Sequence, residues 1–178
     1  MTAPGFALFE TAIGRCGVGW TGSGIAAVAL PESSPERTRA RVLRRLPGAV
    51  ESVQPPQVAR VVEAMVALLA GEPADLSAAV LDLAGVPDFH RQVYEVTRSI
   101  PVGSTLSYGQ VASRIGAPAA AQAVGQALGA NPCPIVVPCH RVLASDGSLR
   151  GFSAEGGVET KRRMLLAEGA TVVAPTLF

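Results

Sequence analysis

The stretch SYGQVASRIGAPAAAQAVGQALGANPCPIVVPCHR, residues 107–141, contains the signals that decide the fold. Serine caps helix N-termini and glycine commonly follows a last turn, so a helix is predicted from Ser107 to Gly116. Pro118 predicts the start of a second helix, which runs to Asn131. Two helices joined by a short turn have the spacing of a helix-turn-helix.

The second of these helices presents mainly small side chains. Its predicted contact face consists of Ala119, Ala120, Ala123, Gly125 and Ala127, with Gln122 as the main polar group. Such short side chains cannot reach base edges across a major groove, but they let a backbone approach a minor groove closely. Small residues equally allow close packing between helices, and from the spacing alone this second interpretation is favoured.

Sequence patterns on either side of this stretch predict an α+β chain. Strands and turns are predicted over residues 6–30 and 77–83, and helices over 34–46 (with basic residues on one face), 56–71, 88–99 (capped by Asp88) and 158–168. The run Gly85-Val86-Pro87 predicts a linker. We therefore expect an N-terminal α/β domain at 1–86, a helical domain at 87–172 and a tail at 173–178.

Composition excludes several classes of protein. The chain has 178 residues, of which 48% are hydrophobic and 16% charged, which favours a folded core over disorder. The net charge of +1 is far from the basic excess of a strong electrostatic DNA binder. Three cysteines and two histidines without a CxxC motif disfavour a zinc cage, so neither a metal nor a cofactor is expected. With no basic leader and no long apolar run, a cytoplasmic location without a membrane partner is expected.

The run Pro138-Cys139-His140-Arg141 is the candidate reactive centre. A lone cysteine usually acts as a small buried hydrophobe, but Pro138 places this one at a bend. His140 and Arg141 are both able to lower a thiol pKa, and the thiolate is the nucleophile. The sequence therefore predicts that Cys139 is nucleophilic.

The longer run SYGQVASRIGAPAAAQAVGQALGANPCPIVVPCHRVLASDGSLRGFSAEGG, continuing to TKRRMLLAEGA, resembles the O6-alkylguanine-DNA alkyltransferases, also called methylated-DNA–protein-cysteine methyltransferases. The resemblance is strong over about residues 88–170. It is looser over 8–85, where TAIGRCGVGW and GIAAVALPE are similar to the family's mixed N-terminal domain. It implies a ribonuclease-H-like N-terminal sheet and a winged helix-turn-helix-like element in the C-terminal domain.

The resemblance implies direct-reversal DNA repair by a monomer that binds the minor groove of double-stranded DNA containing alkylated guanine. A flipped-out O6-alkylguanine, with O4-alkylthymine as a second candidate lesion, would give its alkyl group to Cys139. Flipping is needed because the alkylated atom lies inside the base stack. No route regenerates the thiol, so each molecule would act once, in the cytoplasm and on the nucleoid.

The resemblance also assigns roles to single residues. Cys139 would accept the alkyl group, His140 would take the thiol proton through a water, and Glu168 would orient His140. Tyr108 would donate a hydrogen bond to the guanine ring and push on the phosphate of the flipped nucleotide, and Asn131 would hold the turn before the cysteine.

Further residues are assigned to the substrate pocket and to DNA contact. The implied pocket residues are Val142, whose carbonyl would meet the exocyclic amine, Ser153, which would meet O6, and Phe152 and Lys161. The implied DNA contacts are Tyr108, Ala121, Gln122, Ala123, Gly125, Arg141 and Ser145.

The sequence departs from the family pattern at several positions. Gln122 stands where the family usually has an arginine that fills the gap left by the flipped base, so weaker DNA affinity or slower flipping is expected. Arg150 replaces a glycine, and it would either reach a phosphate or narrow the range of alkyl groups. Phe152 replaces a tyrosine and Tyr94 a tryptophan. The zinc ligands that some members carry have no counterpart.

Three alternative functions compete with alkyl transfer. A lesion-binding relative would mark damage without transfer, although the presence of Cys139 argues against it. A Cys–His hydrolase would need an oxyanion hole, and the sequence has no glycine run of that kind. A helix-turn-helix transcription factor fits poorly with the near-neutral charge. At the residue level, His140 as a core histidine and Glu168 as a plain helix-end charge remain open alternatives.

Overall fold

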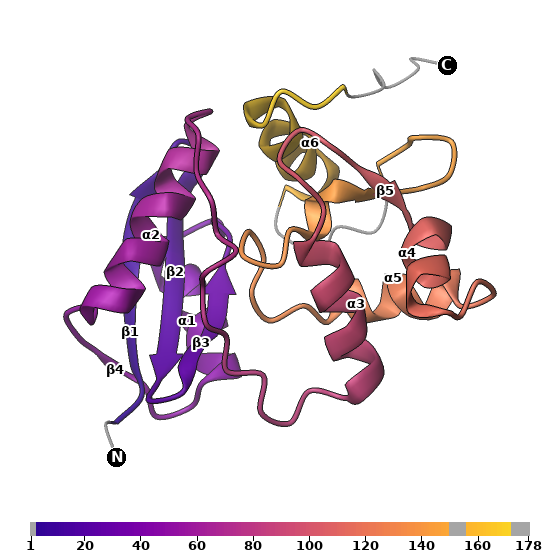
Figure 1. Ribbon diagram of the computed structural model, residues 1–178. Helices are drawn as coiled ribbons and strands as arrows, with labels where there is room; N and C mark the ends of the chain where they lie inside the picture. Colours follow the sequence, from indigo (N-terminus) through magenta and orange to yellow (C-terminus); the bar gives the residue numbers. More distant parts are fainter. Residues whose placement is uncertain (1–2, 150–155, 172–178) are drawn as a thin grey trace.

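The computed structural model describes residues 3–149 and 156–171, and it has an α+β fold with the sheet in the first half and most helices in the second (Figure 1). The first half contains β1 (Gly5–Thr11), β2 (Gly14–Thr21), β3 (Gly24–Ala29), α1 (Pro35–Arg45), β4 (Val50–Glu51) and α2 (Pro56–Leu69). The second half contains α3 (Asp88–Arg98), β5 (Leu106–Ser107), α4 (Tyr108–Ile115), α5 (Ala121–Gly129), the 3-10 helix η1 (Cys139–Arg141), β6 (Val142–Leu143) and α6 (Gly157–Ala167).

The sheet has the strand order β3-β2-β1-β4, with β1, β2 and β3 antiparallel and β4 parallel to β1. Successive side chains of a strand point to opposite faces of the sheet, so β2 can pack against one helix on each face. Cys16 and Val18 face the core on the α2 side, whereas Gly17 lies under α1. A Cβ atom at Gly17 would lie 2.6 Å from Cγ2 of Val42, so only glycine lets α1 approach this closely. Figure 1 shows α1 and α2 on opposite faces of the sheet.

Several helices begin and end where the sequence predicts. The Ser34 side chain caps α1 by accepting from the Arg37 N–H. At α4, Ser107 and Gln110 form a reciprocal capping box, and Gly116 ends the helix in a left-handed conformation with φ 85°. These caps satisfy N–H and C=O groups that a helix end leaves without partners. The two helices predicted in this segment are therefore present as α4 and α5.

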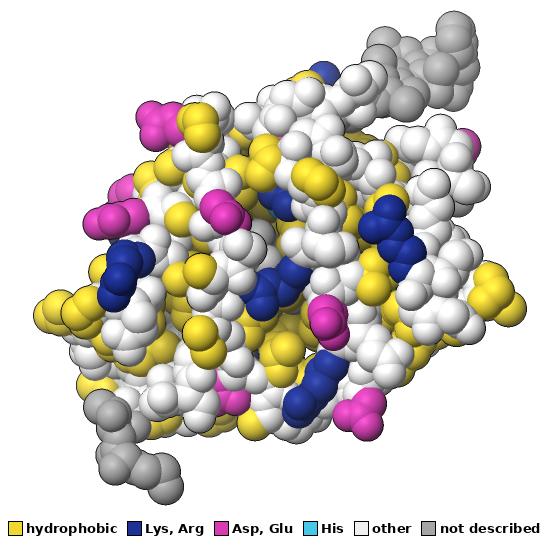
Figure 2. Space-filling model, in the orientation of Figure 1, with side chains coloured by type: hydrophobic (Ala, Val, Ile, Leu, Met, Phe, Trp, Pro, Cys, Tyr) yellow, Lys and Arg dark blue, Asp and Glu magenta, His cyan; other side chains and the backbone are white. Residues whose placement is uncertain are grey.

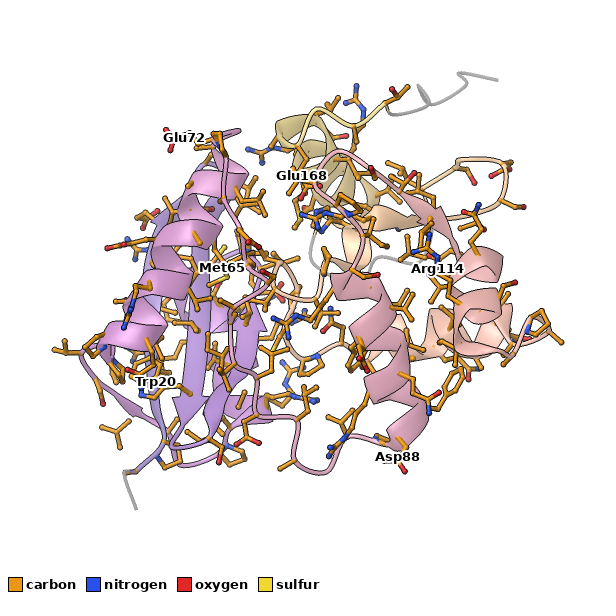
Figure 3. All side chains as sticks on the ribbon, in the orientation of Figure 1. Trp20, Met65, Glu72, Asp88, Arg114 and Glu168 are labelled. Carbon is orange, nitrogen blue, oxygen red and sulfur yellow. The ribbon has the colours of Figure 1, made fainter. Side chains whose placement is uncertain are left out.

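One hydrophobic core extends through both halves of the chain. Met65 of α2 is fully buried in it and lies between the two halves in Figure 3. Val93 of α3 and Val137 belong to the same core. At the outer edge of β3, the Val28 N–H donates to the carbonyl of Pro132 at 2.9 Å. The sheet is thus joined directly to the segment that leads to Cys139.

The structure corrects the strand predicted over residues 77–83. Only Leu81 forms a β-bridge, with Ile25. The Arg98 guanidinium donates to the carbonyls of Ser77 and Ala79, at 3.4 and 2.8 Å. Those carbonyls bind a side chain, so they are not used in a ladder with a neighbouring strand.

Two predicted signals at helix starts are also wrong, although α3 begins at Asp88 as predicted. Pro87 occupies the cap position of α3 and Asp88 is its first helical residue, so Asp88 makes no capping hydrogen bond. Pro118 lies in the turn before α5, which begins at Ala121, because an Ala120-to-Ala117 backbone hydrogen bond continues that turn. The strands β4, β5 and β6 have two residues each, which is too short for an alternating pattern to reveal them.

On the face drawn in Figure 2, basic and acidic side chains are interspersed among hydrophobic ones, so no patch of one charge sign covers it. This distribution agrees with the formal net charge of +1. Within the described ranges, no helix has the length and apolar content that crossing a bilayer requires.

Candidate active site

The segment before Cys139 is held in a tight reversal by Asn131. The Asn131 amide donates to the Val137 carbonyl at 2.9 Å, and its side-chain oxygen accepts from the Cys133 N–H at 3.0 Å. Between them, Ile135 adopts φ 76°, a left-handed conformation that is rare for a β-branched residue. Such strain persists only where surrounding contacts fix the backbone. Asn131 thus bonds to the backbone at two points of the turn before the cysteine.

Cys139 begins η1, and its side chain is partly buried. Burial raises the pKa of the Cys139 thiol above its ordinary value. A hydrogen bond from Asn131, the charge of Lys161 and the N–H groups of Cys139 and His140 oppose this rise without cancelling it. His140 therefore lowers this pKa as expected, through its backbone N–H, but the effect of burial is larger and the net change is a rise. The thiol needs a base to remove its proton near neutral pH.

His140, Arg141 and Glu168 form a buried network at the end of α6, where Figure 3 marks Glu168. His140 Nε2 lies 2.7 Å from Glu168 Oε1, and the two side chains are 1% and 2% exposed. Burial alone would raise the pKa of Glu168, but hydrogen bonds and charges from His140 and Arg141 outweigh it and lower the pKa to about 2. Glu168 is thus more than a charge at a helix end.

The His140 ring is oriented by this carboxylate. Burial lowers the pKa of His140 below its ordinary 6.5, although Glu168 opposes the effect, so the ring is neutral at neutral pH. Glu168 is ionised and can only accept, so Nε2 carries the proton of the neutral ring. His140 Nδ1 is buried and has no hydrogen-bond partner among the residues that the structure describes. That nitrogen is free to act as a base.

Arg141 is inside the protein and does not face DNA. Its guanidinium donates to both oxygens of Glu168, at 2.9 and 2.8 Å, and to the Ile100 carbonyl at 2.7 Å. The side chain is 7% exposed. The expectation that Arg141 contacts DNA is therefore corrected: this arginine compensates the buried Glu168 and ties it to the segment after α3.

Lys161 of α6 lies beside the cysteine, almost wholly buried. Its ammonium donates to the Val142 carbonyl at 2.8 Å and lies 6.0 Å from the centre of the Tyr108 ring. Burial lowers the pKa of Lys161 to about 8, with the Cys139 charge opposing the change. Burial also raises the pKa of Tyr108, so its hydroxyl is a donor at neutral pH. The Lys161 ammonium and the Tyr108 phenol therefore both lie beside the Cys139 thiol.

A cavity of about 500 Å³ brings much of the predicted site together. Cys139, Asn131, Tyr108 and Lys161 all line it. Its other lining residues include Arg41, Arg44 and Arg45 of α1, together with Ala27, Val28 and Leu30 of and just after β3. The sequence shows a basic face on this helix, but nothing in it indicates that the helix lies against the cysteine segment.

The remaining predicted residues that the structure describes do not line this cavity, and they differ in burial. Val142 is fully buried, and Gln122 and Ser145 are exposed, whereas Ala121, Ala123 and Gly125 are partly exposed. Ala127 is buried and its carbonyl accepts from the Tyr94 hydroxyl at 2.7 Å, so it does not belong to the exposed face of α5 as expected. Tyr94, which replaces a tryptophan of the family, is buried in the core. Arg150, Phe152 and Ser153 lie outside the described residues.

Comparison with known proteins gives a consistent result. Residues 88–170 match the family model for the DNA-binding domain of 6-O-methylguanine DNA methyltransferase. The methylated-DNA–protein-cysteine methyltransferase of Methanothermobacter thermautotrophicus is 35% identical over 156 residues, which are 88% of this chain and 80% of that protein.

Solved structures extend the likeness to nearly the whole chain. The Mycobacterium tuberculosis O6-methylguanine methyltransferase has a TM-score of 0.75 and 34% identity, with 98% of this chain and 99% of that one covered. Mycobacterium tuberculosis OGT in complex with DNA has a TM-score of 0.74 and 35% identity, with 92% and 91% covered. The chain therefore belongs to the methylated-DNA–protein-cysteine methyltransferase family.

Proposed function

We propose that this protein repairs DNA by direct reversal, moving an alkyl group from O6-alkylguanine in double-stranded DNA to its own Cys139. The observation that carries the proposal is a cysteine in an open cavity next to a buried Glu168–His140 pair. The activities named for its relatives support it. O4-alkylthymine is a second candidate lesion.

In the proposed reaction, the Cys139 sulfur attacks the alkyl carbon. A carbon–sulfur bond forms as the carbon–O6 bond breaks, and the electron pair of that bond leaves on guanine. His140 Nδ1 takes the thiol proton through a water, while the hydrogen bond to Glu168 stabilises the charged ring. Tyr108 donates to the guanine ring as negative charge develops there. The thioether product is stable, so each molecule acts once.

The guanine would be held by groups beside the sulfur. Lys161 already donates to the Val142 carbonyl, and this oxygen has a second lone pair for the exocyclic amine of guanine. Asn131 forms a side-chain hydrogen bond with the Cys139 sulfur. Phe152 and Ser153 remain part of the proposed pocket on the family resemblance alone.

For DNA binding, we propose that residues 1–86 form a ribonuclease-H-like domain and residues 87–172 the DNA-binding and acceptor domain. In the second, α4, α5 and the β5–β6 pair would act as a winged helix-turn-helix. The exposed face of α5 would enter the minor groove with Ala121, Gln122, Ala123 and Gly125, and Tyr108 and Ser145 would contact the backbone. A monomer suffices for this arrangement.

The experiment that tests the proposed function is an intact-mass measurement after incubation with a duplex containing O6-methylguanine. Transfer adds the mass of one methylene to the protein, and peptide mapping locates it on Cys139. An unchanged mass with retained binding to the damaged duplex would instead identify a lesion-binding protein. The structure offers no specific support for that function, because Cys139 is present and partly exposed.

The rate of transfer is expected to fall in acid as His140 gains a proton. Neutral imidazole is the base, so protonation removes it, and burial places this loss below pH 6.5. Single-turnover rates at saturating duplex, measured from pH 8 downward, test this. Duplex binding is measured at each pH as a control. A decline that begins above pH 7, or none before the protein unfolds, would contradict the role of His140.

Replacing Gln122→Arg is expected to strengthen duplex binding or speed transfer. Gln122 is exposed on α5, and an arginine there adds a charge-assisted hydrogen bond to the space left by the flipped base. A gain of about 1 kcal/mol in binding, roughly fivefold, is the expected scale. The matched control is Gln57→Arg, at an exposed glutamine of α2 that lies outside the proposed DNA-binding helices. Equal effects of both substitutions would mean that only net charge matters.

A further inference from the structure

Helix α1 turns a row of arginines toward the cavity that contains the reactive cysteine. Arg41, Arg44 and Arg45 line this cavity together with Tyr108 and Cys139. Residues three and four positions apart lie on the same side of a helix, so the three guanidinium groups form one cationic wall. We call these three residues the α1 arginine wall.

Two members of the α1 arginine wall are available to a ligand. Arg41 pairs with Glu32 at 2.6 Å, which occupies its charge in part. Arg44 and Arg45 are exposed, and within residues 3–149 and 156–171 neither has an ion pair or a side-chain hydrogen bond. Two uncompensated cations at the rim of a cavity are a site for an anion.

The helix-turn-helix of the proposed function lacks such cations. Helix α5 contains no charged residue, and α4 contains only Arg114. Affinity for DNA depends on neutralising phosphates, which occur every ~3.4 Å along each strand. An uncharged reading helix in a chain of net charge +1 therefore needs phosphate contacts from another element.

The position of α1 relative to the cysteine is fixed by the fold. Val42 packs against Gly17 of β2, and the neighbouring strand β3 is hydrogen-bonded through Val28 to Pro132. Pro132 itself lines the cavity. The α1 arginine wall is thus held opposite the turn after α5, and no movement between the halves is required to present it.

We propose that Arg44 and Arg45 bind a phosphate of the DNA strand that carries the flipped nucleotide, with Arg41 beside them. The proposal rests on the proposed function, since it takes the lesion base to occupy the cavity next to Cys139. A strand whose base enters this cavity brings its phosphodiesters past the rim. Arginine binds phosphate in two-pronged geometry, and this contact supplies the affinity that α5 lacks.

The test compares single charge reversals, Arg44→Glu and Arg45→Glu, with Arg60→Glu as the control. Arg60 is an exposed arginine of α2, on the opposite face of the sheet, so the control changes net charge equally. Each α1 variant is expected to weaken binding to an O6-methylguanine duplex about tenfold, and to reduce the slope of log affinity against log salt by about 0.9. Arg60→Glu is expected to change neither.

Two further measurements separate binding from other roles. At saturating duplex, the single-turnover transfer rate of the α1 variants should equal that of the wild type. A slower rate there, or unchanged affinity, overturns the proposal. A duplex with O6-carboxymethylguanine tests whether the arginines instead recognise an anionic substituent, and a selective loss on this duplex also overturns the proposal. If the wild type never gains mass, the proposed function fails, while the binding and salt measurements still decide the phosphate contact.

Discussion

Replacing Cys139→Ser should leave duplex binding intact and reduce alkyl transfer below detection. Serine preserves the shape of the side chain, but at neutral pH its hydroxyl is a far weaker nucleophile than a thiol assisted by His140. Intact mass after incubation with an O6-methylguanine duplex, together with an affinity measurement on the same duplex, gives both results.

The matched control is Cys133→Ala, six residues earlier in the same segment. Cys133 is fully buried, so a substrate cannot reach it. Burial also raises the pKa of its thiol to about 12. This variant should still gain one alkyl group. A mass gain in Cys139→Ser, or its absence in Cys133→Ala when that variant is folded, would contradict the assignment of the acceptor.

Replacing Glu168→Gln is expected to affect both stability and chemistry. Arg141 would stay buried with its main counter-charge removed, which typically costs about 3–5 kcal/mol. His140 would lose the carboxylate that orients it and stabilises its charged form, and the transfer rate should fall by about 10²–10⁴. Urea unfolding and single-turnover kinetics under conditions where the variant is folded measure the two effects separately.

Glu159→Gln is the matched control, because Glu159 lies on the same helix and pairs with Arg162 at 3.5 Å on the surface. Exposed pairs of this kind contribute about 0–1 kcal/mol, so both stability and rate should stay near wild type. Similar losses in the two variants would show that the charge of α6, and not the buried network, is what matters.

The pH dependence of stability provides an independent check of the buried network. The pKa of Glu168 in the folded protein is lowered from its ordinary 4.5 to about 2. Its stabilisation is therefore complete above pH 4.5 and is lost as pH falls toward 2. Glu168→Gln should lack this component of the acid transition.

The sequence was sufficient to predict the helices whose end residues form caps. Helix α4 follows from Ser107 and Gly116, and α1 from Ser34 and Pro35, because caps act locally. The prediction of a strand over 77–83 failed because the carbonyls of Ser77 and Ala79 accept from Arg98, a residue distant in sequence. A local pattern contains no information about such a partner.

The same distinction applies to the candidate site. The motif around Cys139 indicates the acceptor and its neighbours, and the family resemblance adds Glu168. Neither the motif nor the resemblance reveals that Arg141 is buried. Its position depends on hydrogen bonds to the Ile100 carbonyl and to Glu168, which are distant in sequence from it and from each other. Nor does either of them place α1 beside the cysteine, which depends on the hydrogen bond between Val28 and Pro132.

The raised pKa of Cys139 affects how readily the thiol is oxidised before the protein meets a substrate. Oxidation by peroxides proceeds through the thiolate and increases with exposure. A thiol that stays protonated until a substrate and His140 act on it is a poor target for such oxidants. For a reagent that is consumed in a single turnover, resistance to oxidation while idle keeps the pool of active molecules available for damage.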